Sequence, residues 1–333
     1  NTGFTNFTIT GDAVVKGGNW THSVNSSTES KRLSVTIGGD FDLDGATITG
    51  DSLGYGAGRG PGAGSGEWFG GGYGGYAGGS SNPKFTAKSY GSVLRPVNIG
   101  SGGGNPYGGG AIRLRVAGAL DISGTVTANG GDWGSSRGGG SGGSIWITAL
   151  ALSGDGSISA NGGNSGGGGG RIAIELGADG WDNWDGTVNA HGGAGAYCGA
   201  AGTIRKWDPS MTAHDGLVLV DNNSNVTATN AIITPLPAFA ESTEILARTA
   251  WHVTGKGNLA LLAGAEIEKL EMDAQTRLEL NGEKLVVGRL VVDTVRFPIG
   301  TYTIADSPLF TDVIGTGEIQ VVGSKHVGLI VVR

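Results

Sequence analysis

Cysteine is almost absent from this sequence. Among 333 residues only Cys198 carries a thiol, so no disulfide can form within the chain. The five histidines include no pair at metal-ligand spacing, which argues against a zinc site. Lys and Arg number 22 against 29 Asp and Glu, the formal net charge is −7, and no basic run is present. We therefore expect no nucleic-acid partner and no anionic-membrane partner. The same charge disfavours acidic polysaccharides as bulk ligands, although a local cluster of arginines could still hold one.

Long hydrophobic runs are also missing. No apolar stretch approaches the length needed to cross a bilayer, so we expect a soluble chain without membrane insertion. The sequence begins at Asn1 without a secretion leader, which fits a mature chain that has been secreted. We expect it to be extracellular or held at a cell surface.

Glycine, in contrast, is abundant. Most of the 68 glycines lie between Gly50 and Gly202. Glycine-rich sequence without a pattern is typical of linkers, but here there is a pattern. The motif Ala-Asn-Gly-Gly at residues 128–131 returns at 160–163, and Ala-His-Gly-Gly follows at 190–193. A repeat of this kind indicates an ordered unit that is used several times.

Each unit also contains short runs in which apolar residues occupy every second position, as strands with one buried face do. Three such runs in roughly 30 residues predict an all-β parallel β-helix, or β-solenoid, with Ile112, Ile145 and Ile172 at equivalent inward positions. The glycine-rich segments then form excursions at one corner of each coil. There glycine permits positive φ and close contact between backbones, so that the excursions could stack as a second layer.

The last third of the chain has ordinary glycine content. We assign residues 1–235 to the glycine-rich β-helix and 236–333 to a β-rich region that continues or caps it. Residues 263–280 could also be read as a helix with one apolar face. We prefer strands, because the alternation continues beyond the turn signal at Asn281-Gly282.

Two stretches resemble known proteins. The unit "GGGAIRLRVAGALDISGTVTANGG" and its copies are similar to glycine-rich β-helical regions of large bacterial secreted or surface proteins. The tail "LELNGEKLVVGRLVVDTVRFPIGTYTIADSPLFTDVIGTGEIQVVG" looks like the terminal repeat of autotransporter-associated β-solenoid proteins. The resemblance implies architecture, and it implies little about function, since such regions occur in adhesins, envelope proteins and polysaccharide-degrading proteins.

One motif has the spacing of a calcium loop. In "DFDLDGATITGD" the carboxylates fall where EF-hand and dockerin loops place their ligands, and Gly45 falls at the sharp turn. The candidate Ca²⁺ ligands are Asp40, Asp42, Asp44 and Asp51. The alternative is that these aspartates form the outward face of a strand, because Phe41 and Leu43 alternate with them.

Catalytic residues are harder to find. Asp179, Asp182 and Asp185, with Arg171 and His191 nearby in sequence, could serve a polysaccharide lyase or glycoside hydrolase. Aspartate is also favoured in turns for backbone reasons alone. Whether the chain is an enzyme therefore stays open, with the balance toward a non-catalytic protein.

Several tryptophans lie in glycine-rich or turn segments instead of alternating core positions. Trp133, Trp181 and Trp184 are the candidates for carbohydrate binding, since exposed rings offer flat apolar faces to sugars. They could equally cover glycine backbones and seal a thin core. Stability and glycan binding of alanine variants separate the two.

The favoured function is a non-catalytic, extracellular structural or adhesive protein that assembles with itself into a filament or surface layer, with polysaccharide as a further candidate partner. The alternative is a secreted polysaccharide lyase or glycoside hydrolase, or its carbohydrate-binding module. Residues 327–332, "VGLIVV", are uncharged and strand-like. We expect them to pair with a strand edge, in their own subunit or in a neighbouring one.

Overall fold

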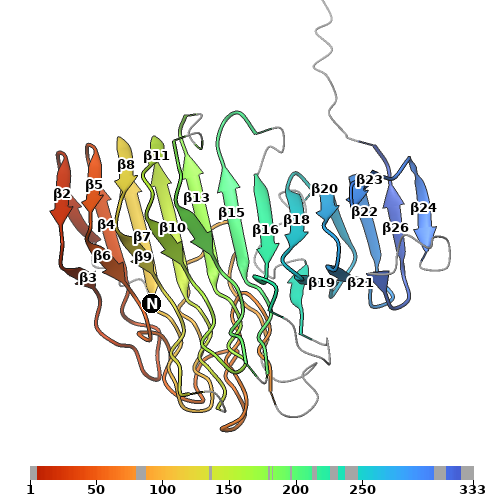
Figure 1. The fold of residues 1–333 in the computed structure, drawn as a ribbon, viewed down its shortest axis with the longest axis horizontal. Coiled ribbons are helices and arrows are strands. Elements are labelled where there is room, and N and C mark those ends of the chain that lie inside the picture. The colour runs from red at the N-terminus through yellow and green to blue at the C-terminus, as the bar shows by residue number, and fades with distance from the viewer. Residues whose placement is uncertain are drawn as a thin grey trace, which may run out of the picture.

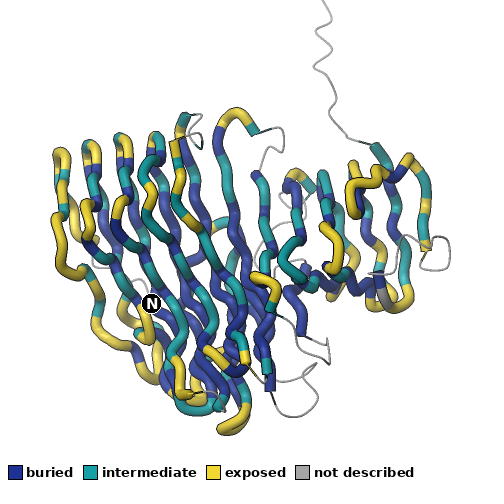
Figure 2. The backbone as a smooth tube through the Cα atoms, in the orientation of Figure 1, coloured by how far each residue is buried: buried dark blue, intermediate teal, exposed yellow. Residues whose placement is uncertain are grey.

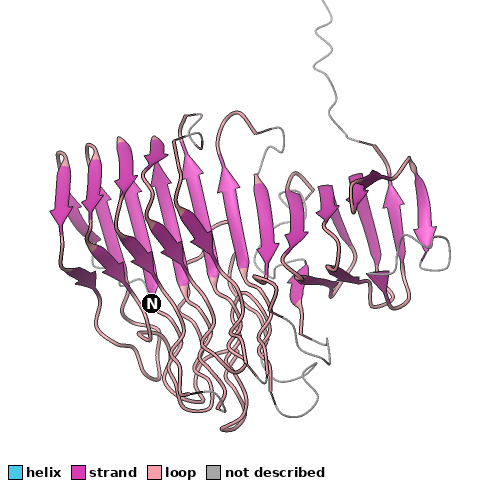
Figure 3. Ribbon diagram, in the orientation of Figure 1, coloured by secondary structure: helices cyan, strands magenta, loops and turns pink. Residues whose placement is uncertain are grey.

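The computed structural model contains strands and loops and, in the part of the chain that it describes, no helix (Figure 3). This confirms the all-β prediction and the preference for strands after residue 263. The described residues are 6–79, 88–134, 137–178, 181, 183–195, 197–211, 216–225, 232–236, 247–303 and 313–323.

One sheet of 13 strands runs through the whole molecule and is called the long sheet here (Figure 1). Most neighbouring strands in it are parallel, and the antiparallel pairs are β15–β16, β22–β23 and β24–β26. Its strands, in spatial order, are β1 (Asn6–Ile9), β4 (Leu33–Ile37), β7 (Ala111–Val116), β10 (Ser144–Ala149), β13 (Arg171–Leu176), β15 (Thr203–Trp207), β16 (Leu217–Asp221), β18 (Ala250–Thr254), β20 (Ala265–Met272), β22 (Lys284–Val292), β26 (Glu318–Val321) and β24 (Gly300–Thr303), with β23 (Val295–Arg296) beside β22.

Three shorter parallel sheets accompany the long sheet. The second sheet contains β2 (Ala13–Lys16), β5 (Phe41–Asp44), β8 (Ala119–Ile122) and β11 (Ala151–Ser153). The third contains β3 (Asn19–Thr21), β6 (Thr47–Thr49), β9 (Thr125–Thr127), β12 (Ser157–Ser159) and β14 (Thr187–Asn189). The fourth contains β17 (Thr234–Leu236), β19 (Asn258–Leu261), β21 (Arg277–Glu279) and β25 (Val313–Ile314).

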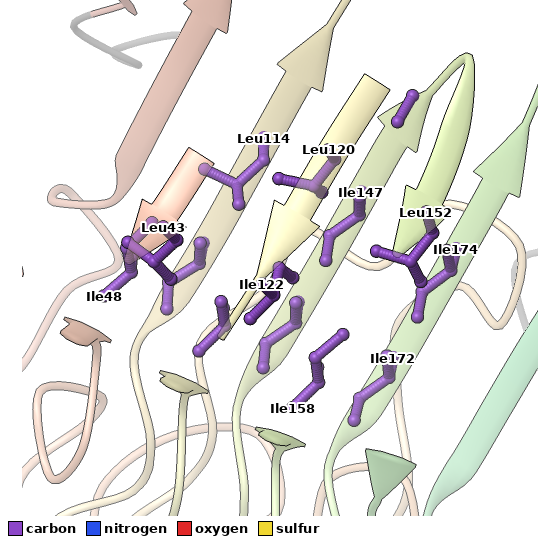
Figure 4. Close-up of a cluster of buried hydrophobic side chains, with 14 of the residues drawn as sticks. Leu43, Ile48, Leu114, Leu120, Ile122, Ile147, Leu152, Ile158, Ile172 and Ile174 are labelled. Atoms are coloured by element: carbon purple, nitrogen blue, oxygen red, sulfur yellow. The ribbon is translucent and has the colours of Figure 1, made fainter. Parts of the chain in front are cut away.

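In the N-terminal half the chain visits the long, second and third sheets in turn and then starts again one strand further on. Ile145 pairs with both Ile112 and Ile172, as the sequence predicted, and all three side chains are buried. Aliphatic side chains from the three sheets form the first core (Figure 4). Each such side chain contributes about 1.5–3 kcal/mol to stability. This arrangement of stacked parallel strands is compatible with a β-solenoid.

The repeated Ala-Asn-Gly-Gly motif forms a ladder at one corner. The Asn161 N–H donates to Asn129 Oδ1 at 2.8 Å, and the His191 N–H donates to Asn161 Oδ1 at 3.1 Å. Below them the Asn129 N–H donates to Asp51 Oδ1 at 2.6 Å. An oxygen-bearing side chain therefore satisfies a backbone donor in the next copy, which explains why the motif recurs.

The glycine-rich excursions hydrogen bond to one another, as the stacking prediction required. The Gly109 N–H donates to the Ser141 carbonyl at 2.8 Å, and Gly142 donates to Gly168 at 2.9 Å. The long excursion between β6 and β7 lies across its neighbours, where the Gly71 N–H reaches the Gly139 carbonyl at 2.9 Å (Figure 1). Much of this loop layer is buried (Figure 2). Most glycines in these contacts have negative φ, so close approach is the main reason for them.

The direction of the chain in the long sheet reverses between β15 and β16, and the core changes face there. Directly paired residues share a face of a sheet. Ile204 pairs with Leu219 and contributes to the first core, whereas Arg205 pairs with Val218, which belongs to a second core. The two cores therefore lie on opposite faces of the long sheet. The domain boundary expected at residues 235/236 stays a prediction.

The second core fills the space between the long and fourth sheets. Trp251 and Leu270 lie at its centre. Asn281 and Gly282, with φ of 54° and 84°, turn the chain from β21 in the fourth sheet to β22 in the long sheet. The turn signal is thus confirmed, although it makes a corner between sheets.

Candidate metal and carbohydrate sites

An acidic groove of about 520 Å³ lies over the second sheet, near the N-terminal coil. On β5 the apolar Phe41 and Leu43 point into the first core, so Asp42 and Asp44 point outward. Asp42 lies in register with Asp121 of β8. The carboxylates that line the groove are those of Asp12, Asp40, Asp42, Asp44 and Asp121.

Most of these carboxylates already have partners. Asp40 Oδ1 accepts from the Ala119 N–H at 2.7 Å, and Asp12 Oδ1 accepts from the Asp40 N–H at 2.8 Å. Lys16 lies 3.4 Å from Asp44 in an exposed ion pair. The carboxylates of Asp40 and Asp12 therefore each bind a backbone N–H of the next coil and connect successive coils at a corner.

Asp51 has a different position from the other candidate Ca²⁺ ligands. It does not line the acidic groove, and it forms the foot of the corner ladder with Asn129. Residues 41–44 and 47–49 are strands of two different sheets instead of one continuous loop. In the described part of the chain no three His, Cys, Asp or Glu side chains are grouped so as to hold a metal ion. Ca²⁺ binding by this motif stays a prediction.

The three candidate tryptophans divide into two kinds. Trp133 is 57% exposed. Trp181 and Trp184 are half-buried and pack against the first core. The Lys206 ammonium lies 4.6 Å from the centre of the Trp181 ring, and burial lowers the pKa of that lysine. The structure therefore does not gather the three rings on one exposed platform, and carbohydrate binding by Trp133, Trp181 and Trp184 stays a prediction.

The candidate catalytic residues that the structure describes, Arg171, Asp185 and His191, have separate roles. Arg171 is fully buried, where its guanidinium donates to the Tyr90 carbonyl at 3.0 Å, to Thr203 Oγ1 at 3.0 Å and to Ser89 Oγ at 2.8 Å. These hydrogen bonds from Arg171 attach residues 89 and 90 to the long sheet. Asp185 is exposed and His191 belongs to the corner ladder. Asp179 and Asp182 lie outside the described residues.

Arg113 and Arg115 lie on the outer face of the long sheet and were not among the sequence predictions. On β7, Arg113 and Arg115 alternate with Ile112 and Leu114, which are in the first core. The sequence pattern could therefore have predicted that the two arginines face away from that core. Arg95 is close enough for its charge to contribute to the lowered pKa of Arg113.

The described part of the chain contains no helix of the length and apolarity that a membrane crossing requires. No protein-family model, curated protein or solved structure matches the chain.

Proposed function

We propose that this chain is a non-catalytic extracellular β-solenoid protein with a structural or adhesive role, whose copies associate end to end. The parallel registers support the solenoid, since equivalent residues of successive coils pair directly. The hydrogen-bonded excursions add a second layer that stiffens the stack. A rigid rod of repeating coils is suited to building a filament or a surface layer.

The observation that carries the proposal is the open N-terminal coil. Among the described residues, β1, β2 and β3 are each the last strand of a different sheet, so three parallel strand edges end together. On the same coil Phe7 is 55% exposed and Val14 is 56% exposed. Unpaired strand edges with exposed apolar side chains favour pairing with another chain.

A second copy of the chain is the partner that fits this edge. Successive coils of the molecule already pair in parallel, so the free edge of β1 resembles the edge that β4 offers to β1 and the edge that β7 offers to β4. Residues 327–332, which lie outside the described residues, supply an uncharged strand-like segment long enough to cover the four residues of β1. We propose that this segment of one copy adds to the long sheet of the next.

The test compares assembly of the intact chain with that of a charged end variant. Phe7→Lys with Val14→Lys places charge on the open coil, and Leu150→Lys is the matched control because Leu150 is 49% exposed at a corner inside the stack. We expect polymers of the intact chain and of the control by electron microscopy and sedimentation, and monomers of the double variant. An intact chain that stays monomeric at high concentration, or a double variant that polymerises normally, contradicts the proposal.

A further inference from the structure

Three arginines, Arg95, Arg113 and Arg115, form a group on the outer face of the long sheet, called the arginine strip here. Arg113 and Arg115 lie on β7, two residues apart and therefore on the same face. Arg95 lies in the segment between Tyr90 and Asn98, which is attached to this face by two hydrogen bonds. Arg171 Nε donates to the Tyr90 carbonyl, and Ser144 Oγ donates to the Asn98 carbonyl.

Polar side chains continue the strip across the neighbouring strands. Arg113 is in register with Ser34 of β4 and Trp146 of β10. Arg115 is in register with Thr36 and Thr148 on the same two strands. Thr36, Arg115 and Thr148 are half-buried, as expected for an accessible sheet face. Hydrogen-bonding groups thus recur at the strand spacing of about 4.8 Å.

The positive charge of the strip is not neutralised. The nearby Glu175 carboxylate is bound by Arg205 at 2.8 Å. Among the described residues no carboxylate forms an ion pair with the guanidinium of Arg95, Arg113 or Arg115. Burial, followed by the charges of Arg115 and Arg95, lowers the pKa of Arg113 to about 10, and Glu175 acts in the opposite direction.

Two hydrogen-bond donors in the strip also lack acceptors. The Arg113 guanidinium lies over the Trp146 indole, with Cζ 3.7 Å from the ring centre. Arg113 Nε and Trp146 Nε1 are both buried without a hydrogen-bond partner, and Trp146 as a whole is 8% exposed. Unpaired buried donors cost free energy, which an acceptor brought by a ligand would recover.

We propose that the arginine strip binds the carboxylate groups of an acidic polysaccharide lying across β4, β7 and β10. Guanidinium groups match carboxylates because they donate two parallel hydrogen bonds. The hydroxyls of Thr36 and Thr148 supply partners for sugar hydroxyls. Arg113 turns from the indole toward the ligand, which gives its Nε an acceptor and uncovers an aromatic face for a sugar ring. The net charge of −7 opposes every polyanion at long range, so binding depends on the local guanidinium contacts, and single-stranded DNA is tested as the competing polyanion.

The experiment titrates the full chain with polygalacturonate by calorimetry and uses fully methyl-esterified polygalacturonate as the uncharged match. We expect the ester to bind at least about tenfold more weakly, because it cannot form charge-assisted hydrogen bonds. Arg113→Ala with Arg115→Ala should weaken polygalacturonate binding by at least about tenfold as well. Raised salt should weaken binding of the intact chain.

Arg289→Ala is the control variant, since Arg289 is an exposed arginine on β22, which is remote from the strip in the long sheet. It should bind like the intact chain, and circular dichroism should show that all variants are folded. The proposal is overturned if polygalacturonate does not bind, if the ester binds equally well, or if the double variant matches the control. Preferential binding of single-stranded DNA also overturns it. These results are separable from the assembly test, which changes only Phe7, Val14 and Leu150.

Discussion

Gly110, Gly143, Gly170 and Gly202 stand one above another where successive excursions enter the long sheet. A Cβ on Gly143 would overlap the carbonyl oxygen of Gly110, and the same relation links Gly170 to Gly143 and Gly202 to Gly170. None of the four has positive φ. Glycine is therefore required here by backbone-to-backbone contact, and alanine would force the excursions apart.

His22 occupies the next place below this stack. Its Nδ1–H donates to the Ser23 carbonyl at 2.9 Å, and its Nε2 accepts from the Ala111 N–H at 3.3 Å. Making the two bonds together requires the neutral ring, because a protonated Nε2 cannot accept the Ala111 N–H. Burial lowers the pKa of His22 below its usual value of 6.5, against an opposing effect of the Ser23 hydrogen bond.

We expect protonation of His22 to destabilise the fold. Because the folded-state pKa is lowered, the contribution of His22 is fully present above pH 6.5 and is lost as pH falls from there through the folded-state value. Melting temperatures measured between pH 8 and pH 5 should decline for the intact chain and decline less for His22→Gln. Equal declines in the two proteins would contradict this role.

The strands of the N-terminal half could be read from the sequence because their two faces differ. Ile112, Ile145 and Ile172 alternate with residues that are polar or small, apart from Trp146, so periodicity assigns them inward. The reversal at β16 could not be read in this way. Its sequence, Leu-Val-Leu-Val, is apolar on both faces, because Leu219 packs against the first core and Val218 against the second.

The candidate site was less predictable than the strands. The aspartates after Gly39 match a calcium loop in spacing, but Phe41 and Leu43 set β5 in register with β8, and this fixes Asp42 outward. Between Asp44 and Asp51 the chain passes from the second sheet to the third, and this separates the two carboxylates in space. The spacing of the motif in the sequence gives no sign of that change of sheet. Long-range register, which no local motif encodes, decides where these carboxylates lie.

The two kinds of tryptophan should respond differently to truncation. Trp184→Ala removes a ring packed against the first core, and we expect a loss of about 2 kcal/mol, below the roughly 3–5 kcal/mol of a fully buried aromatic. Trp133→Ala removes an exposed ring and should change stability by less than about 0.5 kcal/mol. Urea denaturation followed by circular dichroism measures both.

A glycan array completes this comparison. If Trp133 contacts sugar, Trp133→Ala should weaken glycan binding while the fold stays intact. A large stability loss for Trp133→Ala, or none for Trp184→Ala, would contradict the assignment.

At the scale of the whole molecule, the long sheet has the first core on one face in the N-terminal half and the second core on the opposite face in the C-terminal half. The ends of the molecule are unlike in the described residues: β1, β2 and β3 are edge strands that belong to parallel pairs, whereas the long sheet finishes at β24, which is antiparallel to β26. Copies that meet through unlike ends form a heterologous contact, which continues into a filament unless its rotation closes a ring.

Deleting Gly328–Arg333 tests which part of the second copy meets the open coil. If this segment pairs with β1 of a neighbour, the shortened chain should remain a stable monomer with an unchanged melting temperature, and polymers seen with the intact chain should disappear from electron micrographs. A marked fall in melting temperature would instead mean that the segment pairs within its own subunit. Polymers that persist after the deletion would exclude the segment and leave the end coil to pair with another edge of the second copy, which the Phe7 and Val14 variants would still disrupt.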